Sequence, residues 1–297
     1  MPETRRLAAV VLAVALAVPV AASADHPFGN IPWPNLLPPR PGVPATPNPA
    51  QPCGAHPSAT CVDGVIQQMI QNWEPLDSAC DARAVFALTY LITTQAFRDT
   101  LGTGFFADED AMINLDREFA NLFFSATDGY ASGTAPPAWR IAFDAATALR
   151  TNAVQDVFLG MNAHIQRDLP VALWRVGLVR PDGTSRKPDH DRVNEILSAV
   201  LDRIEDEIAR LYDPLVTTLD AKPSPVDEIG ALETLKSWRE GAWRNAERLA
   251  LARTAAERAR VMTSIETYSV TWATVIAAPD FSFYADRRYT YCRRAHA

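Results

Sequence analysis

A run of apolar residues at helical spacing most constrains the fold of this chain. Between residues 193 and 211 the large aliphatic side chains recur every three or four positions, so they share one face of a helix, and charged residues fill the opposite face. The stripe is Val193, Ile196, Leu197, Val200, Leu201, Ile204, Ile208 and Leu211. A helix of this kind must bury its stripe against other helices, which predicts a bundle.

Similar patterns follow one another throughout the chain beyond residue 62. No segment alternates with the period of two that is typical of strands, and proline and glycine breakers separate the periodic stretches. We find no internal repeat. The pattern predicts an all-α protein with a single multi-helix bundle in residues 62–297, with helices near 63–73, 79–101, 108–127, 137–150, 153–177, 190–212, 226–253 and 256–277.

The first 24 residues have the layout of a secretory signal peptide. Arg5 and Arg6 precede an apolar run from Leu7 to Val20, and the small residues 22–24 suit signal peptidase, so we expect cleavage before Asp25. A retained membrane anchor is the alternative, but the run is shorter than the roughly 20 residues of a span and contains a proline. The mature chain is therefore expected to lack a transmembrane segment and to be secreted or associated with the cell envelope.

Residues 25–61 form a proline-rich leader. Its prolines exclude a helix or a packed core and predict an extended, polyproline-like segment. Two alternatives remain, a spacer or a strap that lies on the domain. Large apolar residues such as Ile31 and Trp33 suit the strap.

The charge balance narrows the class of partner. The chain has a formal net charge of −7, and non-specific nucleic-acid binding depends on clustered basic side chains. An acidic surface also disfavours docking on anionic lipid. The sequence therefore predicts no nucleic-acid partner, and leaves an unknown small molecule or an envelope component.

Four cysteines, an even number, favour disulfides in an exported protein, with three possible connectivities. We favour Cys53–Cys61 as a small loop and Cys80–Cys292 as a clasp between the tail and the start of the domain. A zinc site is the rival interpretation, and the absence of paired Cys-x-x-Cys spacings argues against it.

The strongest candidate site is the turn that holds His164 and Asp168. Residues four apart share one side of a helix, and Asp168 falls within an apolar stripe, where a carboxylate is costly unless it is paired or bound to a metal. Pro170 follows and is expected to bend the helix there. The pair could serve as two metal ligands, or as a base with its orienting carboxylate. Alternatively it is structural, with Asp168 paired to a buried arginine such as Arg140 or Arg150.

Two further acids lie near apolar helix faces and are candidate contributors to a divalent metal site. Asp116 lies at the edge of the stripe formed by Met112, Leu115 and Phe119, and Asp191 begins the long amphipathic helix, where it could also act as an N-terminal charge. Inward acids on facing helices form carboxylate metal sites in helical bundles. The predicted metal ligands are thus His164, Asp168, Asp116 and Asp191.

Standard hydrolase motifs are absent from the sequence. It has no His-Glu-x-x-His pair, no Gly-x-Ser-x-Gly elbow and no phosphate-binding glycine loop. Its five histidines are too few for a trinuclear zinc phosphoesterase, because only His164 and His190 lie within the helical domain.

The segment Gly160-Met161-Asn162-Ala163-His164-Ile165, with Asp168-Leu169, resembles an uncharacterised helical family found largely in actinobacteria, domain of unknown function 5995. Other parts of the chain resemble that family in the same order. They are the segment from Leu115-Asp116 to Phe119, Trp139 with Phe143, Asp191 with Asn194, and Trp238 near Ala242-Trp243. The resemblance implies a shared fold and a site centred on Asn162, His164 and Asp168, and it carries no catalytic roles. The chain departs from it at Phe123-Phe124, where a tyrosine is expected.

Three functions are compatible with these features. The first is a secreted, metal-dependent hydrolase-like protein in which Asn162, His164 and Asp168 form the primary catalytic site and a divalent metal polarises a substrate oxygen or activates water. The second is a non-catalytic envelope protein that binds a ligand or a partner and keeps a structural His/Asp pair. The third is a carrier that holds an apolar ligand inside the bundle.

Overall fold

The computed structural model describes residues 31–38, 42–216 and 225–296, and within these ranges the protein is an all-α bundle without a strand. The predicted signal peptide lies outside the described residues. None of the helices in the described ranges is sufficiently long and apolar to span a membrane. The helices are α2 (Trp33–Leu36), α3 (Ala59–Ser78), α4 (Ala84–Thr100), α5 (Glu109–Ala131), α6 (Pro137–Thr147), α7 (Ala153–Met161), η1 (Asn162–Asp168), α8 (Leu169–Val176), α9 (Lys187–Leu211), α11 (Pro225–Leu251), α12 (Ala255–Ala277), η2 (Ser282–Tyr284) and α13 (Ala285–Ala295).

Every helix expected from the sequence is present, and two regions differ from expectation, the leader and the tail. The expectation that prolines exclude a helix from the leader was wrong for the single turn α2, whose proline lies in its first turn, where no backbone N–H is needed. The helix expected near 153–177 contains the π-helical segment η1, and α13 was not expected. The segment of α13 has four arginines and no leucine, isoleucine, valine or methionine, so it lacks the aliphatic stripe from which the other helices were predicted.

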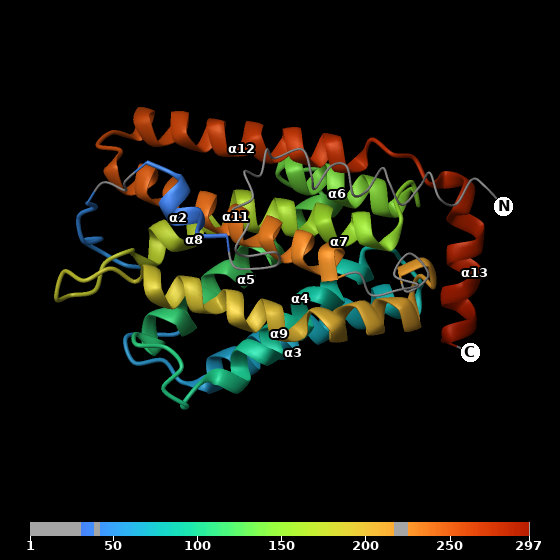
Figure 1. Cartoon of the computed structure of the whole chain (residues 1–297), viewed down its shortest axis with the longest axis horizontal. Coiled ribbons are helices and arrows are strands. Elements are labelled where there is room, and N and C mark those ends of the chain that lie inside the picture. Colours follow the sequence, from blue (N-terminus) through green and yellow to red (C-terminus); the bar gives the residue numbers. More distant parts are fainter. Residues whose placement is uncertain (1–30, 39–41, 217–224, 297) are drawn as a thin grey trace.

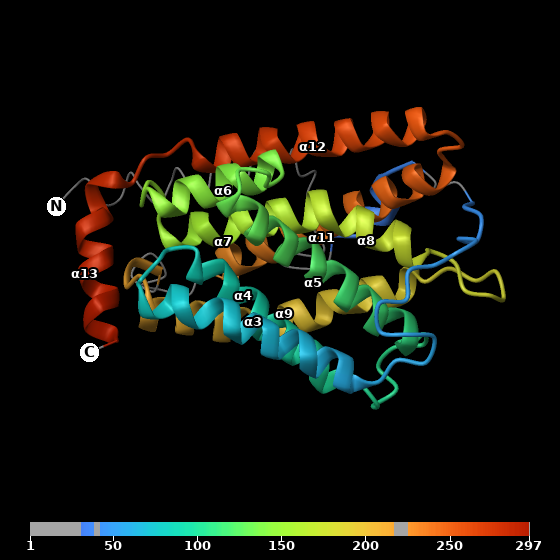
Figure 2. The ribbon, with the colours of Figure 1, turned by 180° about the vertical axis from the view of Figure 1, so that it is seen from behind.

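The long helices lie roughly along one axis of the molecule (Figure 1). Helix α12 follows one long edge, α3 and α9 follow the opposite edge, and α13 lies across one end. The view from behind shows the same arrangement (Figure 2). The continuous helix α7–η1–α8 is central, since α4, α5, α6, α11 and α12 all contact some part of it.

A close approach between two helices explains one glycine of the candidate segment. A Cβ atom placed on Gly160 would lie 2.2 Å from Cγ of Phe86, far inside van der Waals contact. Glycine therefore lets α7 lie directly against α4, and it brings the Phe86 ring to 6.1 Å from the ring of His164.

The described residues of the proline-rich leader, 31–38 and 42–61, lie on the domain as a strap. Trp33 donates its indole N–H to Glu233 at 3.0 Å, and the backbone N–H of Ala50 donates to the carbonyl of Arg175 at 2.7 Å. Val43 and Ala50 pack against the core. Of the two alternatives left by the sequence, the contacts favour the strap over the spacer.

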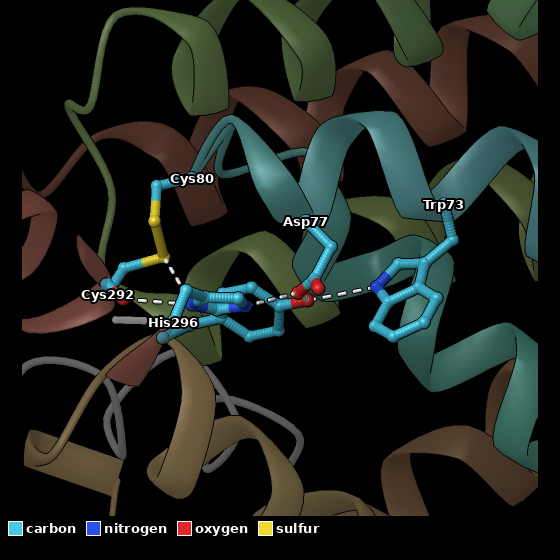
Figure 3. The surroundings of a disulfide bond; sticks show 6 residues. Trp73, Asp77, Cys80, Cys292 and His296 are labelled. Atoms are coloured by element: carbon cyan, nitrogen blue, oxygen red, sulfur yellow. Dashed lines mark hydrogen bonds and ion pairs between the residues drawn. A yellow bond between two sulfur atoms is a disulfide. The ribbon is translucent and has the colours of Figure 1, made fainter. Parts of the chain in front are cut away.

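Both expected disulfides are present, Cys53–Cys61 and Cys80–Cys292. Figure 3 shows the second, which joins α13 to the residues after α3. Beside it, His296 Nε2 lies 2.9 Å from Oδ1 of Asp77, and that carboxylate also accepts from the hydroxyl of Tyr212. The C-terminal helix is thus held covalently and by hydrogen bonds.

A second set of contacts anchors α13 through a buried arginine, and we name it the Arg288 cluster. Arg288 pairs with Asp156 at 2.7 Å and donates to the carbonyl of Thr151 at 2.9 Å. The Thr151 hydroxyl donates to Asp156 at 2.5 Å. Asp213 accepts from Tyr284 at 3.2 Å and from the backbone N–H of residue 153 at 3.1 Å. The charges and hydroxyls of this cluster are paired with one another or with backbone.

Candidate functional site

A cavity of about 110 Å³ lies inside the bundle, between two walls. Helices α4, α5 and the α7–η1–α8 helix form one wall, and α9 with α11 forms the other. Most of the lining is apolar, with a few polar side chains among aliphatic and aromatic ones, which is the usual composition of a small-molecule site. The lining residues are Phe86, Thr89, Tyr90, Thr93, Thr94, Phe97, Met112, Leu115, Asp116, Phe119, Met161, His164, Ile165, Leu169, His190, Val193, Leu197, Leu235 and Arg239.

His164 lies on this cavity inside a group of aromatic rings. Its ring stacks on Phe119 with the ring centroids 3.4 Å apart and meets Tyr90 edge-on at 4.5 Å. Its Nδ1 lies 3.2 Å from Oδ2 of Asp168, whereas its Nε2 is buried without a hydrogen-bond partner. Burial lowers the pKa of His164, and the bond to Asp168 opposes this shift. The imidazole is therefore neutral at pH 7.

Asp168 is fully buried behind His164 and is completely bonded. Oδ2 accepts from the indole of Trp139 at 2.8 Å and lies against His164, and Oδ1 accepts from Arg167 at 2.5 Å. Arg167 in turn reaches Glu266 on α12 at 3.1 Å. The carboxylate therefore has an arginine partner, as expected if the His164–Asp168 pair is structural. The partner is the adjacent Arg167 and not Arg140 or Arg150. Because Asp168 accepts from Nδ1, it fixes the tautomer of His164 in which Nε2 is an acceptor.

These two side chains project from η1, a turn of π-helix. The wider turn is closed by the backbone N–H of Leu169, which donates to the carbonyl of His164. Pro170, which has no N–H, lies at the start of α8. Single π-helical turns are rare and occur often at functional sites. The irregularity expected at Pro170 thus lies in the turn before it.

Asp116 lies on the same cavity. Its residue as a whole is partly exposed, but its Oδ2 is buried and has no hydrogen-bond partner. Burial of the carboxyl group raises the pKa of Asp116 to about 7, with a smaller opposing effect from Arg117. At neutral pH this group is therefore close to half protonated and can donate or accept.

The structure places the other two predicted site residues elsewhere. Asn162 donates to the carbonyl of Ser269 at 2.9 Å and accepts from Gln166 at 2.7 Å, so its amide joins η1 to α12 and does not line the cavity. Asp191 is bonded to Lys187 one turn earlier in α9 and does not line the cavity either.

The four predicted metal ligands do not gather around one point. Within the described ranges, the one group of three His, Cys, Asp or Glu side chains whose ligand atoms lie within 4.8 Å of one another is Cys80, Cys292 and His296, and its two sulfurs are bonded to each other. Of the predicted set, His164 and Asp168 are in contact and Asp116 shares their cavity. The arrangement does not fit a closed multi-ligand metal centre.

Unpaired polar atoms concentrate on the cavity. Ten buried side-chain nitrogen or oxygen atoms of the described residues lack a hydrogen bond. Four of these ten lie in ion pairs, on Asp156, Arg288, Glu240 and Arg180. Of the other six atoms, four belong to residues that line the cavity, and we name them the four unpaired cavity groups: Tyr90 Oη, Thr94 Oγ1, Asp116 Oδ2 and His164 Nε2.

Tyr90, Thr94 and Arg239 are among the polar residues of this cavity that were not identified from the sequence. Helix α4 is buried on nearly all sides, so no apolar stripe distinguishes its hydroxyl groups. Arg239 did carry a signal. It lies four residues after Leu235 and three before Ala242, at a position of the apolar stripe of α11.

The walls can therefore make defined hydrogen bonds to a molecule in the cavity. His164 Nε2 is an acceptor, while the hydroxyls of Tyr90 and Thr94 are donors or acceptors. Burial raises the pKa of Tyr90 well above its usual range, and the nearby Asp116 and Asp168 act in the same direction, so this hydroxyl keeps its proton.

Comparison with protein families finds a match to this chain. A family model with the description "Family of unknown function (DUF5995)" matches residues 62–279. No curated protein and no solved structure matches the chain.

Proposed function

This chain belongs to the DUF5995 family, whose function is unknown, and we propose from its own residues that it binds a small organic ligand in the cavity beside His164. The ligand is mainly apolar and carries at least one hydrogen-bonding group. Of the functions expected from the sequence, this one combines the ligand-binding and the apolar-carrier hypotheses.

The four unpaired cavity groups carry the proposal. An unmade hydrogen bond of a buried polar group costs about 1–3 kcal/mol, and native proteins contain few of them. Four such atoms line a single cavity and belong to α4, α5 and η1. Together they lower the stability of the ligand-free protein, because none of them has a hydrogen-bond partner. A ligand with a complementary polar group would remove part of this cost.

The size and lining of the cavity define the ligand further. A volume of about 110 Å³ is of the order of the roughly 150 Å³ engineered cavity that holds benzene. The cavity therefore fits a single ring, a short branched chain or one end of a longer molecule. Phe97, Met112, Leu115 and Leu197 are among the side chains that would contact its apolar part.

His164 supplies the recognition of the polar part. Asp168 holds the imidazole in one tautomer and stacking on Phe119 holds its plane, so Nε2 is a fixed acceptor inside an apolar wall. The same arrangement suits a general base. Catalytic roles for His164, Asp168 and Asn162 and a bound divalent metal stay predictions. Metal analysis of the purified protein checks the metal, and stoichiometric zinc, manganese or magnesium is the outcome that would support it.

We also propose that the protein acts outside the cytoplasm. The signal-peptide layout of residues 1–24 and two disulfides support this. Expression of the full chain in a secreting host, followed by N-terminal sequencing, tests it. A mature protein that begins at Asp25 is the expected result, and a retained Met1 would contradict it.

A fragment screen tests the ligand site. Small compounds with one ring or a short chain and a single polar group are added to the mature protein and followed by ligand-observed NMR and thermal unfolding. A compound present at 100 times its dissociation constant raises the free energy of unfolding by about 2.7 kcal/mol.

Two variants of α9 locate the binding. Val193→Phe adds volume to the cavity wall, whereas Ala199→Phe places the same ring on an exposed position of that helix. We expect Val193→Phe to abolish binding of the hits and Ala199→Phe to leave it unchanged. If every hit binds both variants equally well, the ligand site is not this cavity.

A further inference from the structure

The α9–α11 wall of the cavity contains a buried positive charge without a carboxylate partner. Arg239 is 6% exposed, and no Asp or Glu of the described residues lies within salt-bridge distance of it. Its pKa falls to about 10 because burial disfavours the charged form, with Asp191 acting in the opposite direction. The guanidinium still carries its charge at pH 7.

The existing hydrogen bonds of Arg239 are to neutral groups. Nε donates to the side-chain oxygen of Asn194 at 2.8 Å, and Nη2 donates to the carbonyl of His190 at 2.5 Å. Nη2 also lies 3.4 Å from Nδ1 of His190. For Nη1 we find no hydrogen bond within the described residues, so two of the five guanidinium N–H groups remain available.

The two nearest candidates for a counter-ion are not paired with it. Asp191 is bonded to Lys187. Asp116 lines the same cavity from α5 and forms no salt bridge with Arg239, and its pKa of about 7 means that it is only about half ionised at pH 7. A buried charge without a partner is costly, because its desolvation is not compensated. An anion inside the cavity would compensate it.

We infer that the ligand of this cavity is a small monocarboxylate, whose carboxylate binds Arg239 while its apolar part fills the space towards His164. This inference rests on the proposed ligand site and adds the chemical class of the ligand. Arginine is the side chain best suited to a planar carboxylate, because its N–H groups match both oxygens. The hydroxyl groups on the α4 wall are then available to a second polar atom, as in a hydroxy or keto acid.

Matched pairs of ligands test the charge. Propionate, butyrate and benzoate are compared with propionamide, butyramide and benzamide, which have nearly the same shapes and no charge. Dissociation constants are measured at pH 7 by calorimetry or ligand-observed NMR. We expect at least one acid to bind about tenfold or more tightly than its amide, because charge-assisted hydrogen bonds are roughly twice as strong as neutral ones.

Three variants separate recognition from structure. In Arg239→Gln the ratio between acid and amide should fall to about one, and in Arg239→Lys a preference for the acid should persist. Arg244→Gln is the control, since Arg244 lies on the same helix, pairs with Glu240 at 2.8 Å and does not line the cavity. It should keep the ratio of the wild type. The ratio within one variant is the informative quantity, because partial loss of folding lowers both affinities together.

The outcomes distinguish this inference from the ligand site itself. Equal affinity for acids and amides in the wild type, or an unchanged ratio in Arg239→Gln, overturns the carboxylate assignment and leaves the cavity as a site for neutral ligands. If Arg239→Gln cannot be purified folded, the wild-type and Arg239→Lys ratios decide. If no compound of either series binds, the assignment fails, while the fragment screen with Val193→Phe still decides the ligand site.

Discussion

Two buried polar regions of this protein contrast sharply. In the Arg288 cluster every charge has a partner of opposite sign or a backbone group at 2.5–3.2 Å. On the cavity, the four unpaired cavity groups have no hydrogen-bond partner. The charge of Arg239 is bonded to the side chain of Asn194 and to a backbone carbonyl but has no partner of opposite sign. Arg288 and Asp156 are buried, and so are Thr94, His164 and Arg239, so burial alone does not explain the difference.

The difference indicates what each region is for. A closed, fully bonded network anchors one element to another, here α13 to the bundle, and gives nothing to a ligand. Unpaired groups on a cavity lower the stability of the ligand-free protein, and proteins retain such costs where binding or chemistry needs them. The comparison predicts opposite responses to substitution in the two regions.

The largest effect is expected for the covalent link at the α13 end. Replacing Cys80 and Cys292 together by serine removes a link across 212 residues and should lower the free energy of unfolding by roughly 5 kcal/mol through loop entropy. Urea unfolding measures it. The corresponding change at Cys53 and Cys61, only 8 residues apart, should cost roughly 2–3 kcal/mol. Equal losses of stability in the two double variants would mean that loop length does not determine how much each disulfide stabilises the fold.

Next in size is the loss of the central arginine of the Arg288 cluster. Arg288→Met leaves the buried carboxylate of Asp156 without its partner and should cost about 3–5 kcal/mol. Arg287→Met, at the adjacent exposed position, should change the stability by less than about 0.5 kcal/mol. Urea unfolding of both variants at pH 7 is the measurement, and similar values for the two would remove the distinction between the regions.

A pH-dependent effect is expected from Asp116. Its folded-state pKa of about 7 lies above the ordinary 3.8, so the folded protein binds more protons within this window and loses stability as the pH rises from about 4 to about 7. The slope for one proton is at most about 1.4 kcal/mol per pH unit. Asp116→Asn should remove this slope, so the difference in stability between variant and wild type should grow with pH.

Subtracting the two pH profiles isolates Asp116 from the opposite effect of His164. The lowered pKa of His164 makes the folded protein less stable as the pH falls below the ordinary value of 6.5. Both proteins retain that histidine, so its effect cancels in the difference. Parallel profiles from pH 4 to pH 7 would show that the carboxyl group of Asp116 is not desolvated.

The smallest effect is also the most direct comparison, because it uses two threonines of α4 that both line the cavity. The Thr89 hydroxyl donates to the carbonyl of Val85 at 2.9 Å, whereas the Thr94 hydroxyl is unpaired. Thr94→Val should raise the free energy of unfolding by about 1 kcal/mol, and Thr89→Val should lower it by a similar amount. Thermal and urea unfolding report the sign. Two losses of equal size would show that Thr94 has a partner after all.

Local patterns predicted much of the fold. The eight expected helices are present, because most carry an apolar stripe that defines a buried face, while α4 is mainly apolar and buried on nearly all sides. The tail helix α13 escaped this reasoning, since it has no large aliphatic side chain. Its buried residues are Arg288 and Cys292, which bind Asp156 and Cys80.

The candidate site was predicted in part. His164 and Asp168 are four residues apart on one helical turn, so their contact is a local property, and the structure forms it. Asp116 was correctly expected near an apolar face, and it lies on the cavity. Asn162 and Asp191 were predicted to belong to the site and do not line the cavity. The side chain of Asn162 donates to α12, and the carboxylate of Asp191 is bonded to Lys187.

By itself, the sequence determined the all-α class, eight of the helices and the proximity of His164 to Asp168, because each depends on spacing along the chain. It left three cysteine connectivities open, and the tertiary structure decided between them. Only the tertiary structure decided that Tyr90, Thr94 and Arg239 share a cavity with that histidine. Those residues are brought together by the packing of α4, α9 and α11 against one another, and helical periodicity shows which face of a helix is buried but not which other helix covers it.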